Sequence, residues 1–396
     1  MGGLGAARPV LRRELVADWR PAHHCAYLQS GRGIGRCLLV SRRSEPTALR
    51  VLHVAEALGG GVAAALKRYV RAVPDAEHHL LYARRADAPI DAALLAIFSS
   101  ADEMVRGHLG RVKQLRQLAQ SAAFDVLHLH SSFAGAYGRL AAFKSERLRI
   151  VYTPHCFAFE RQDVGRLHKL NYIVVEALLG LNTSMIAACS EREQALGTRI
   201  VGKSKSVLVP NAVDDVFVRL QSEIPFADSH VLRVAAGGRL SAQRDPNFFV
   251  RVRKVLHDAD VLFTWIGGGD PSGEAELRRN GIRVTGWLDE EGVVRALKES
   301  DIYFHTAAWD GFPMSVLEAT ALGVPSVVRR TTAFAGMEIK GLVETPSEAA
   351  ASLRSLRRSA SRLRLLRNWR SALKKYNPNE QEAALRRVYG VSDVIR

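Results

Sequence analysis

The sequence predicts an α/β protein made of two doubly wound Rossmann-like domains that face each other across a cleft. Short apolar runs rich in Val, Ile and Leu alternate with helical stretches along most of the 396 residues. Such alternation is typical of parallel sheets that are covered by helices. The alternation pauses once, at 210–229, and then resumes. Because one parallel sheet rarely holds so many strands, two domains joined near this pause are the simpler interpretation.

The predicted strands follow in a regular order, and a helical stretch separates each from the next. In the first half they lie at 49–55, 78–83, 124–130, 148–154, 184–189 and 205–210. In the second half they lie at 232–240, 261–269, 282–287, 301–306 and 325–330. We therefore predict an irregular basic head, a first Rossmann-like domain, a second one and a C-terminal helix, at 1–48, 49–218, 219–376 and 377–396.

Two stretches supply most of the net charge of +16. The head has eight Arg and three acids, and 351–376 has nine basic residues and no acid. The remainder is nearly neutral, which argues against a uniformly basic face for nucleic acid. Leu353, Leu366 and Trp369 recur at roughly helical spacing in the second stretch. This stretch is either a basic amphipathic helix on an anionic membrane or a surface helix whose apolar stripe packs on the protein. We favour the packed helix because such stripes are common on surface helices.

The four cysteines form neither a C-x-x-C pair nor a cluster with zinc spacing, so the sequence predicts no metal site. Their scatter fits a reducing compartment. No run of about 18 uncharged apolar residues indicates a membrane-spanning helix, and the first residues lack the apolar core of a secretory signal. With 47% apolar and 24% charged residues, we expect a globular protein of the cytoplasm.

Ligands of doubly wound sheets bind beyond the carboxyl ends of the strands, so the loops that follow strands are the candidate site. The first such loop contains Gly59, Gly60 and Gly61 before a helix. Glycines let a ligand approach the backbone, and a helix N-terminus attracts anions. A tight turn would explain the same glycines equally well. The Asp-x-Asp pair at 258–260 precedes its strand, so we interpret it as a turn.

Two histidines, His130 and His155, also follow predicted strands. A single His in such a place is more often structural than chemical. Phe157 and Glu160 come shortly afterwards and either line the cleft or pack. The Ser-Glu-Arg-Glu segment at 190–193 fits a helix capping box, so we interpret it as structural.

In the second half, Arg239 and Arg244 lie in one loop between a strand and a helix. Guanidinium groups pair bidentately with phosphate oxygens, so the two side chains predict a diphosphate clamp; two solvated Arg residues are the alternative. Gly238 and Gly268 belong to glycine turns after strands, and Trp287 ends a further strand. Trp287 either stacks on a nucleobase or belongs to the core.

The stretch WDGFPMSVLEATALGVP, at 309–325, places two acids around a helix start. Pro313 suits a first helical position, so we predict a helix from about 313 to 322. Asp310 lies just before the positive end of this helix, and Glu318 lies more than a turn inside it. Backbone N–H groups there suit phosphate oxygens, and the carboxylates suit sugar and ribose hydroxyls.

Taken together, these motifs resemble glycosyltransferase family 4, whose members are retaining enzymes with the GT-B fold. Asp310 and Glu318 resemble the family's Glu-x7-Glu signature, with Asp in place of the first Glu. GGRLSAQR, at 237–244, resembles its G-R-[LF]-x-x-x-K stretch with Arg244 at the Lys position, and VPNAVD resembles its P-N-G-V-D link. TPHCFAFE and the Gly-rich loop match too. The resemblance covers about 49–390. The local sequences around Asp310 and His155 are similar to those of family members that build bacterial surface polysaccharides.

The resemblance implies a role for each candidate residue. Glu318 would bind the donor ribose, and Asp310 would hold a hydroxyl of the transferred sugar. Arg239 and Arg244 would hold the diphosphate, and His155 would contact the donor sugar or the developing charge. The remaining donor-binding candidates are Gly60, Gly61, Gly238, Gly268, Trp287, Gly311, Phe312, Met314 and Ser315. The acceptor-side candidates are His130, Phe157 and Glu160.

The implied reaction moves a sugar, with retention and without a metal or cofactor, from a nucleoside-diphosphate sugar to a glycan or polyprenyl-linked acceptor. The first domain would be the acceptor side, the second would bind the nucleotide sugar, and the C-terminal helix would pack back on the first. Peripheral contact with the inner face of the membrane would bring the enzyme to its acceptor, in cell-surface polysaccharide biosynthesis. The rival functions are a sugar-nucleotide epimerase of the same fold and a non-catalytic sugar-nucleotide-binding scaffold. A phosphorylase is disfavoured, because no Lys has a convincing context for pyridoxal phosphate.

Overall fold

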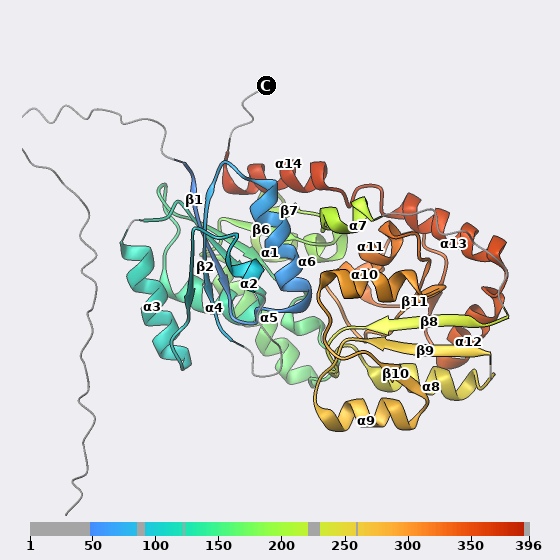
Figure 1. The fold of residues 1–396 in the computed structure, drawn as a ribbon. Coiled ribbons are helices and arrows are strands. Elements are labelled where there is room, and N and C mark those ends of the chain that lie inside the picture. Colours follow the sequence, from blue (N-terminus) through green and yellow to red (C-terminus); the bar gives the residue numbers. More distant parts are fainter. Residues whose placement is uncertain (1–47, 85–91, 122, 221–229, 259, 392–396) are drawn as a thin grey trace, which may run out of the picture. The chain divides into compact units, whose positions relative to one another are not determined.

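The computed structural model describes residues 48–84, 92–121, 123–220, 230–258 and 260–391, and the predicted head at 1–47 lies outside them. Its described residues form two parallel β-sheets flanked by helices, which confirms the predicted fold class (Figure 1). The predicted domain boundaries stay predictions. We call the part built on the first sheet the first lobe and the part built on the second sheet the second lobe.

The first sheet has seven parallel strands within the described residues, in the order β3-β2-β1-β4-β5-β6-β7. They are β1 (Arg50–Ala55), β2 (Glu77–Tyr82), β3 (Ser100–Glu103), β4 (Val126–His130), β5 (Arg149–Thr153), β6 (Met185–Ala188) and β7 (Ser206–Leu208). The sequence predicts all of them except β3. Its residues Ser-Ala-Asp-Glu contain no apolar run and stay largely exposed, because β3 is the edge strand. The strand order reverses between β1 and β4, where such sheets bind their ligands.

The helices of the first lobe connect successive strands. They are α1 (Gly60–Ala72), α2 (Ala92–Leu95), α3 (His108–Gln120), α4 (Ser131–Ala141), α5 (Arg166–Gly180), α6 (Glu191–Val201) and α7 (Asp215–Arg219), with 3-10 turns η1 (Ala158–Glu160) and η2 (Lys203–Lys205). Half of the predicted capping box is present at α6, because the Ser190 hydroxyl accepts from the Glu193 N–H at 3.2 Å. The Glu193 carboxylate does not reach back to Ser190 and instead binds other loops, as described below.

The second sheet has six parallel strands in the part of the chain that the structure describes, in the order β10-β9-β8-β11-β12-β13. They are β8 (Leu232–Gly237), β9 (Val261–Ile266), β10 (Ile282–Val284), β11 (Ile302–His305), β12 (Ser326–Arg329) and β13 (Leu342–Val343). The surrounding helices are α8 (Pro246–Val255), α9 (Pro271–Arg279), α10 (Glu290–Lys298), α11 (Met314–Ala321), α12 (Pro346–Ser355) and α13 (Ser359–Ala372), with the 3-10 turn η3 (Thr332–Phe334). Only β13, a two-residue strand, is absent from the predicted set.

The apolar residues of 351–376 belong to the core of the second lobe. Leu353 and Trp369 are fully buried, and the Trp369 indole N–H donates to the Ser326 carbonyl at 2.6 Å. The packed alternative is therefore confirmed, and the apolar stripe of this segment is not available to a membrane. Arg357, in the same segment, pairs with Asp258 and Asp260. None of the described helices is long and apolar enough to cross a bilayer.

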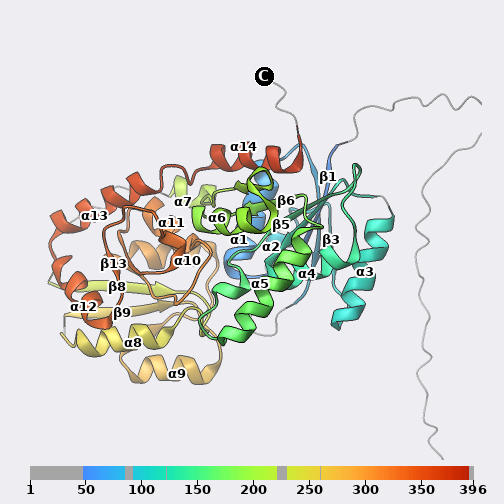
Figure 2. The ribbon, with the colours of Figure 1, turned by 180° about the vertical axis from the view of Figure 1, so that it is seen from behind.

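Helix α14 (Pro378–Tyr389) returns to the first lobe and packs against α1 and the strands β5 to β7 (Figure 2). Leu385 and Val388 are fully buried in the apolar cluster that includes the first sheet. The Tyr389 hydroxyl lies 2.8 Å from Nδ1 of His128, and Arg386 pairs with Asp75 at 2.8 Å. Helix α14 thus contributes to the core of the first lobe.

Candidate active site

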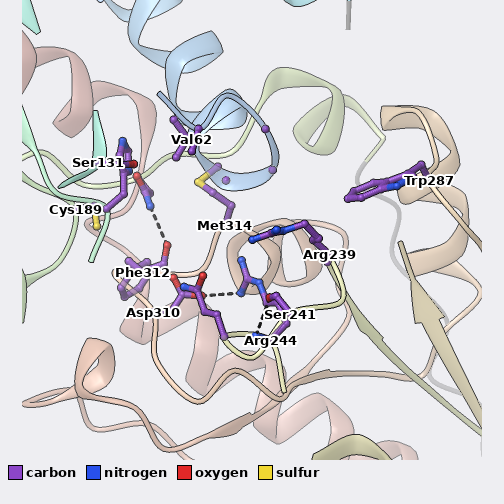
Figure 3. A pocket seen from close by; sticks show the side chains of 18 residues that line it. Val62, Ser131, Cys189, Arg239, Ser241, Arg244, Trp287, Asp310, Phe312 and Met314 are labelled. Atoms are coloured by element: carbon purple, nitrogen blue, oxygen red, sulfur yellow. Dashed lines mark hydrogen bonds and ion pairs between the residues drawn. The ribbon is translucent and has the colours of Figure 1, made fainter. Parts of the chain in front are cut away.

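A cavity of about 300 Å³ lies where the loops after the strands of both sheets meet (Figure 3). Ten of its lining residues are predicted site residues: Gly60, Gly61, His155, Gly238, Arg239, Arg244, Trp287, Asp310, Phe312 and Met314. The others were not given a role in the prediction, although Gly59 belongs to the predicted glycine loop: Ala57, Gly59, Val62, Ser131, Cys189, Asn211, Ser241 and Gln243. Most of the predicted donor-binding residues therefore share one cavity.

The first residues of two helices, α1 and α11, line this cavity, and the first N–H groups of a helix have no partner within the helix. Helix α1 begins at Gly60, whose φ of +51° is a backbone conformation that side chains disfavour. Helix α11 begins at Met314, one residue after the predicted Pro313. Neither first turn contains an acid that would occupy the N–H groups. The two N-termini give the cavity a positive potential that suits an anion.

Two guanidinium groups reach the same cavity from the loop after β8. Figure 3 shows Arg239 and Arg244 side by side below Met314. The Arg244 guanidinium donates to the Asp310 carboxylate at 2.7 Å, and the Arg244 carbonyl accepts from the Thr306 hydroxyl at 2.6 Å. The first bond fixes the direction of the Arg244 side chain, and the second fixes its backbone. The loop after β8 and the loop after β11 thus form one unit.

The Asp310 carboxylate is ionised and already has partners. Burial by itself would raise its pKa, but Arg244 and His305, whose Nε2 lies 3.3 Å away, lower it to about 2. Asp310 therefore orients Arg244 in this structure. The two departures from the family's signatures, Asp for Glu and Arg for Lys, are partners in one ion pair, in which a shorter acid meets a longer base.

The loop that carries His155 is held against the loop that carries Asp310. A Cβ atom at Gly311 would lie 2.7 Å from the Cys156 nitrogen, so only Gly permits this approach. The Glu193 carboxylate accepts from the N–H groups of Cys156 and Cys189, both at 2.7 Å. The capping-box acid is thus used to position a loop of the site, a role that the local sequence did not reveal.

The backbone at the site adopts conformations that non-Gly residues rarely adopt. Among the described residues, the non-Gly positions with positive φ are Ser131 at 70°, His155 at 52°, Cys156 at 95° and Asp245 at 42°. Ser131 and His155 line the cavity, and the other two adjoin lining residues. Such conformations cost roughly 1–3 kcal/mol each and concentrate at functional sites.

His155 is neutral at physiological pH. Burial lowers its pKa to about 4, although the nearby Asp310 acts in the opposite direction. Its Nε2 lies 3.2 Å from Nδ1 of His130, which is fully buried and does not line the cavity. His155 thus lies between His130 and the cavity, and His130 does not reach a ligand in the cavity in this structure.

Several predicted residues do not line the cavity. Glu318 is half-buried in α11, and burial raises its pKa to about 7. Phe157 is fully buried and stacks on Phe159 at 4.9 Å, so it packs in the core. Glu160 instead accepts from the Thr332 hydroxyl at 3.1 Å. The remaining predicted residues outside the lining are Gly268, Gly311, Ser315 and His130.

The positions of Trp287 and Asn211 depend on the tertiary structure. Trp287 is 42% exposed and lines the cavity, so it is not a core residue. Asn211 belongs to the VPNAVD segment, and its side-chain amide donates to the Phe312 carbonyl at 3.0 Å. A lining position for Asn211 could have been inferred only from knowing that this segment contacts the loop just before α11.

Family models match both halves of the chain. Residues 59–217 match Glycosyltransferase Family 4, and residues 232–359 match Glycosyl transferases group 1. An uncharacterized 41.2 kDa protein in the cps region of Klebsiella pneumoniae is 26% identical over 307 residues, which cover 74% of this chain and 84% of that protein. The UDP-Gal:alpha-D-GlcNAc-diphosphoundecaprenol alpha-1,3-galactosyltransferase of Escherichia coli is 26% identical over 234 residues, which cover 54% of this chain and 60% of that protein.

Solved structures share the fold. HepE from Anabaena, in complex with UDP and glucose, has a TM-score of 0.69 at 16% identity, with 87% of this chain and 100% of HepE covered. Sucrose-phosphate synthase from Thermosynechococcus elongatus has a TM-score of 0.67 at 14% identity, with 86% of this chain and 98% of the synthase covered. The two family models together cover most of the chain, and the solved structures have the same fold as this chain. The protein therefore belongs to the family 4 glycosyltransferases of the GT-B fold.

Proposed function

We propose that the cavity binds a nucleoside-diphosphate sugar, with the diphosphate between Arg239, Arg244 and the N-termini of α1 and α11. The observation that carries the proposal is the convergence of these four positive elements on one cavity. Guanidinium groups and helix N-termini are the two protein groups best suited to phosphate oxygens. Support also comes from HepE, which was solved with UDP-glucose.

The remaining roles follow from the position of each side chain. Trp287 stacks on the base, since its ring is exposed at the cavity. His155 contacts the sugar, and Asp310 keeps Arg244 aligned through their 2.7 Å bond. Glu318 binds the ribose after a local adjustment, because in this structure it lies outside the lining residues.

The leaving group of the proposed reaction is an anion, the nucleoside diphosphate, and its charge decides which protein groups can assist the reaction. As the bond to the sugar breaks, negative charge grows on the diphosphate, and Arg239, Arg244 and the two helix N-termini stabilise it. Preorganised groups of this kind typically contribute about 2.7–4 kcal/mol each to lowering the barrier. We propose that transfer retains the anomeric configuration and needs no metal. Proton NMR of the glycosidic linkage would show inversion if the first point fails, and loss of turnover in EDTA would contradict the second.

The donor proposal can be tested with two matched Arg variants. Titration calorimetry with a panel of UDP-, GDP- and dTDP-sugars identifies the donor, and Arg239→Ala should weaken its binding by about tenfold or more. Arg233→Ala is the control, because its side chain is 52% exposed and lies outside the cavity. Equal affinity of both variants would refute the assignment. Release of nucleoside diphosphate that depends on added acceptor distinguishes a transferase from an epimerase or a scaffold.

We propose further that the acceptor is lipid-linked and that α5 is the surface which meets the membrane. The E. coli relative acts on a diphosphoundecaprenol-linked sugar. Helix α5 contacts η1, which follows the His155 loop, and both belong to the first lobe, which we expect to be the acceptor side. The exposed apolar surface that a membrane needs is therefore on the first lobe, whereas the 351–376 stripe is buried.

The outer face of α5 is unusually apolar for a surface helix. Its exposed apolar residues, which we call the α5 surface, are Leu167, Leu170, Ile173, Val174, Val175 and Leu178, with exposures from 46% to 69%. Arg166 and Lys169 border them, and no exposed acid lies on the helix. Its one acid, Glu176, is buried against Arg139 at 2.9 Å. An apolar helix face with basic flanks fits an anionic bilayer.

Vesicle co-sedimentation tests this surface. Binding to vesicles that contain phosphatidylglycerol should exceed binding to pure phosphatidylcholine, and the double variant Leu170→Glu/Val174→Glu should abolish it. Leu262→Glu is the control, because Leu262 is 53% exposed on β9 of the second lobe. Unchanged binding of the double variant would refute the proposal. A dimer in solution that the same variant dissociates would instead assign the α5 surface to a second copy of the chain.

A further inference from the structure

Four histidine rings form a continuous hydrogen-bonded row that runs across the first sheet to the cavity. Nε2 of His78 lies 2.9 Å from the Val73 carbonyl oxygen, and Nδ1 of His78 lies 2.9 Å from Nε2 of His53. Nδ1 of His53 lies 3.1 Å from Nε2 of His130, and Nδ1 of His130 lies 3.2 Å from Nε2 of His155. The rings come from β2, β1, β4 and the loop after β5, which are neighbours in the sheet.

The Val73 carbonyl sets the direction of every hydrogen bond in the row. A carbonyl oxygen only accepts, so His78 must donate through Nε2, and a neutral ring then has an unprotonated Nδ1. Burial lowers the pKa of all four histidines, to about 4 for His155, so the rings are neutral at pH 7. Each Nε2 therefore donates and each Nδ1 accepts along the whole row. The reverse order would leave Nε2 of His78 and the carbonyl as two facing acceptors.

The row ends at His155, and its direction fixes what that ring can do. Nε2 of His155 carries the proton that His130 accepts, so Nδ1 is an acceptor. Within the described residues, the structure gives the His155 ring a hydrogen bond at Nε2 and none at Nδ1, and His155 lines the cavity. We propose that His78, His53 and His130 are positioning residues that hold His155 as its Nε2–H tautomer, so that Nδ1 accepts a hydrogen bond from a sugar hydroxyl.

The tautomer decides between the two roles that the family resemblance implies for His155. Phosphate oxygens carry no proton that an unprotonated nitrogen could accept, whereas every sugar hydroxyl does. A neutral acceptor also cannot stabilise negative charge on the leaving diphosphate. His155 is thus a sugar contact, and charge stabilisation is left to the Arg residues. This inference rests on the proposed donor, but the tautomer itself can be measured without any ligand.

A metal ion is the competing explanation for so many buried rings. The nitrogens of His53, His128 and His130 lie within 4.8 Å of one another. His128, however, is bonded to the Tyr389 hydroxyl and the Thr153 hydroxyl, both at 2.8 Å. In the described part of the chain, each ring nitrogen of these three residues has a protein partner. Hydrogen bonds therefore account for the cluster, and a metal would have to displace them.

NMR of the ¹⁵N-histidine-labelled full-length protein tests the row, since long-range ¹H–¹⁵N correlations distinguish the two neutral tautomers from the cation. We expect the Nε2–H form for His155. His53→Phe removes the acceptor of His130 and should shift His155 toward Nδ1–H, whereas His53→Asn keeps an acceptor oxygen near the Nδ1 position and should restore the wild-type pattern. His79→Phe is the control, because His79 lies on the same strand as His78 but bonds Ser100.

Several results would overturn the proposal. These are an Nδ1–H or doubly protonated His155 in the wild type, an unchanged tautomer in folded His53→Phe, or one bound metal ion per chain by elemental analysis. If His53→Phe does not fold, the wild-type and His53→Asn spectra still show whether His155 has the expected Nε2–H tautomer.

Ligand affinity supplies a second readout. His53→Phe should weaken UDP-glucose, or the sugar nucleotide that the panel selects, by about two- to tenfold and leave the nucleoside diphosphate unaffected. Equal losses for both ligands would refute the sugar contact. A wild-type protein that binds neither would refute the proposed donor, while the spectra would still test the row.

Discussion

Replacing Gly311 by Ala tests whether the close contact between the His155 loop and the Asp310 loop is needed. The new Cβ would lie 2.7 Å from the Cys156 nitrogen, 2.8 Å from the His155 carbonyl carbon and 3.1 Å from the Cys189 sulfur. Ordinary contacts begin at about 3.5 Å, so the loops must separate by about 0.8 Å. Two of the three atoms are backbone atoms and cannot rotate away. Overpacking of this kind costs about 1–3 kcal/mol.

The same displacement should lower activity, because a misplacement of about 1 Å can cost on the order of 100-fold in rate. We expect a lower urea midpoint and a 10- to 100-fold lower kcat/KM, measured by nucleoside diphosphate release. Gly165→Ala is the matched control. Its φ is −70°, and its Cβ would meet only His168 Nδ1, at 4.0 Å. If both variants keep wild-type midpoints and turnover, the contact does not constrain the site.

Three further predictions follow from the described contacts. Arg244→Ala should lower kcat/KM by about 10²–10³, and the double variant with Asp310→Asn should be no worse, since Asp310 acts through Arg244; additive losses would show an independent role. Burial raises the pKa of Glu318 from 4.5 to about 7. Between these pH values the folded protein therefore binds more protons than the unfolded chain. Its free energy of unfolding should fall as the pH rises, by up to about 3 kcal/mol in total. Glu318→Gln should flatten this dependence between pH 4.5 and 7.5 in urea titrations, and an unchanged slope would refute the shift. Trp287→Ala should weaken the nucleotide by about 1–3 kcal/mol without lowering the melting temperature, whereas Trp265→Ala, at a fully buried position, should destabilise the protein by about 3–5 kcal/mol; equal melting shifts would contradict the contrast.

Much of the fold could be predicted because buried parallel strands are continuous apolar runs. Strand β3 was missed for the same reason, since an exposed edge strand needs no such run. The site could be predicted in outline because the rule that ligands bind beyond strand ends needs only the strand order. Ser131, Cys189 and Asn211 were missed because their lining positions depend on contacts between segments far apart in the chain.

The sequence alone determined the two doubly wound sheets, the loops that carry the site and the paired Arg residues, since all of these depend on local patterns. Only the tertiary structure decided which apolar surfaces are covered. It buried the 351–376 stripe, left α5 exposed and placed Trp287 at the cavity. It also aligned His78, His53, His130 and His155 into one row. The physical reason is that periodicity shows which face of an element is apolar, whereas the partner of that face comes from another part of the chain.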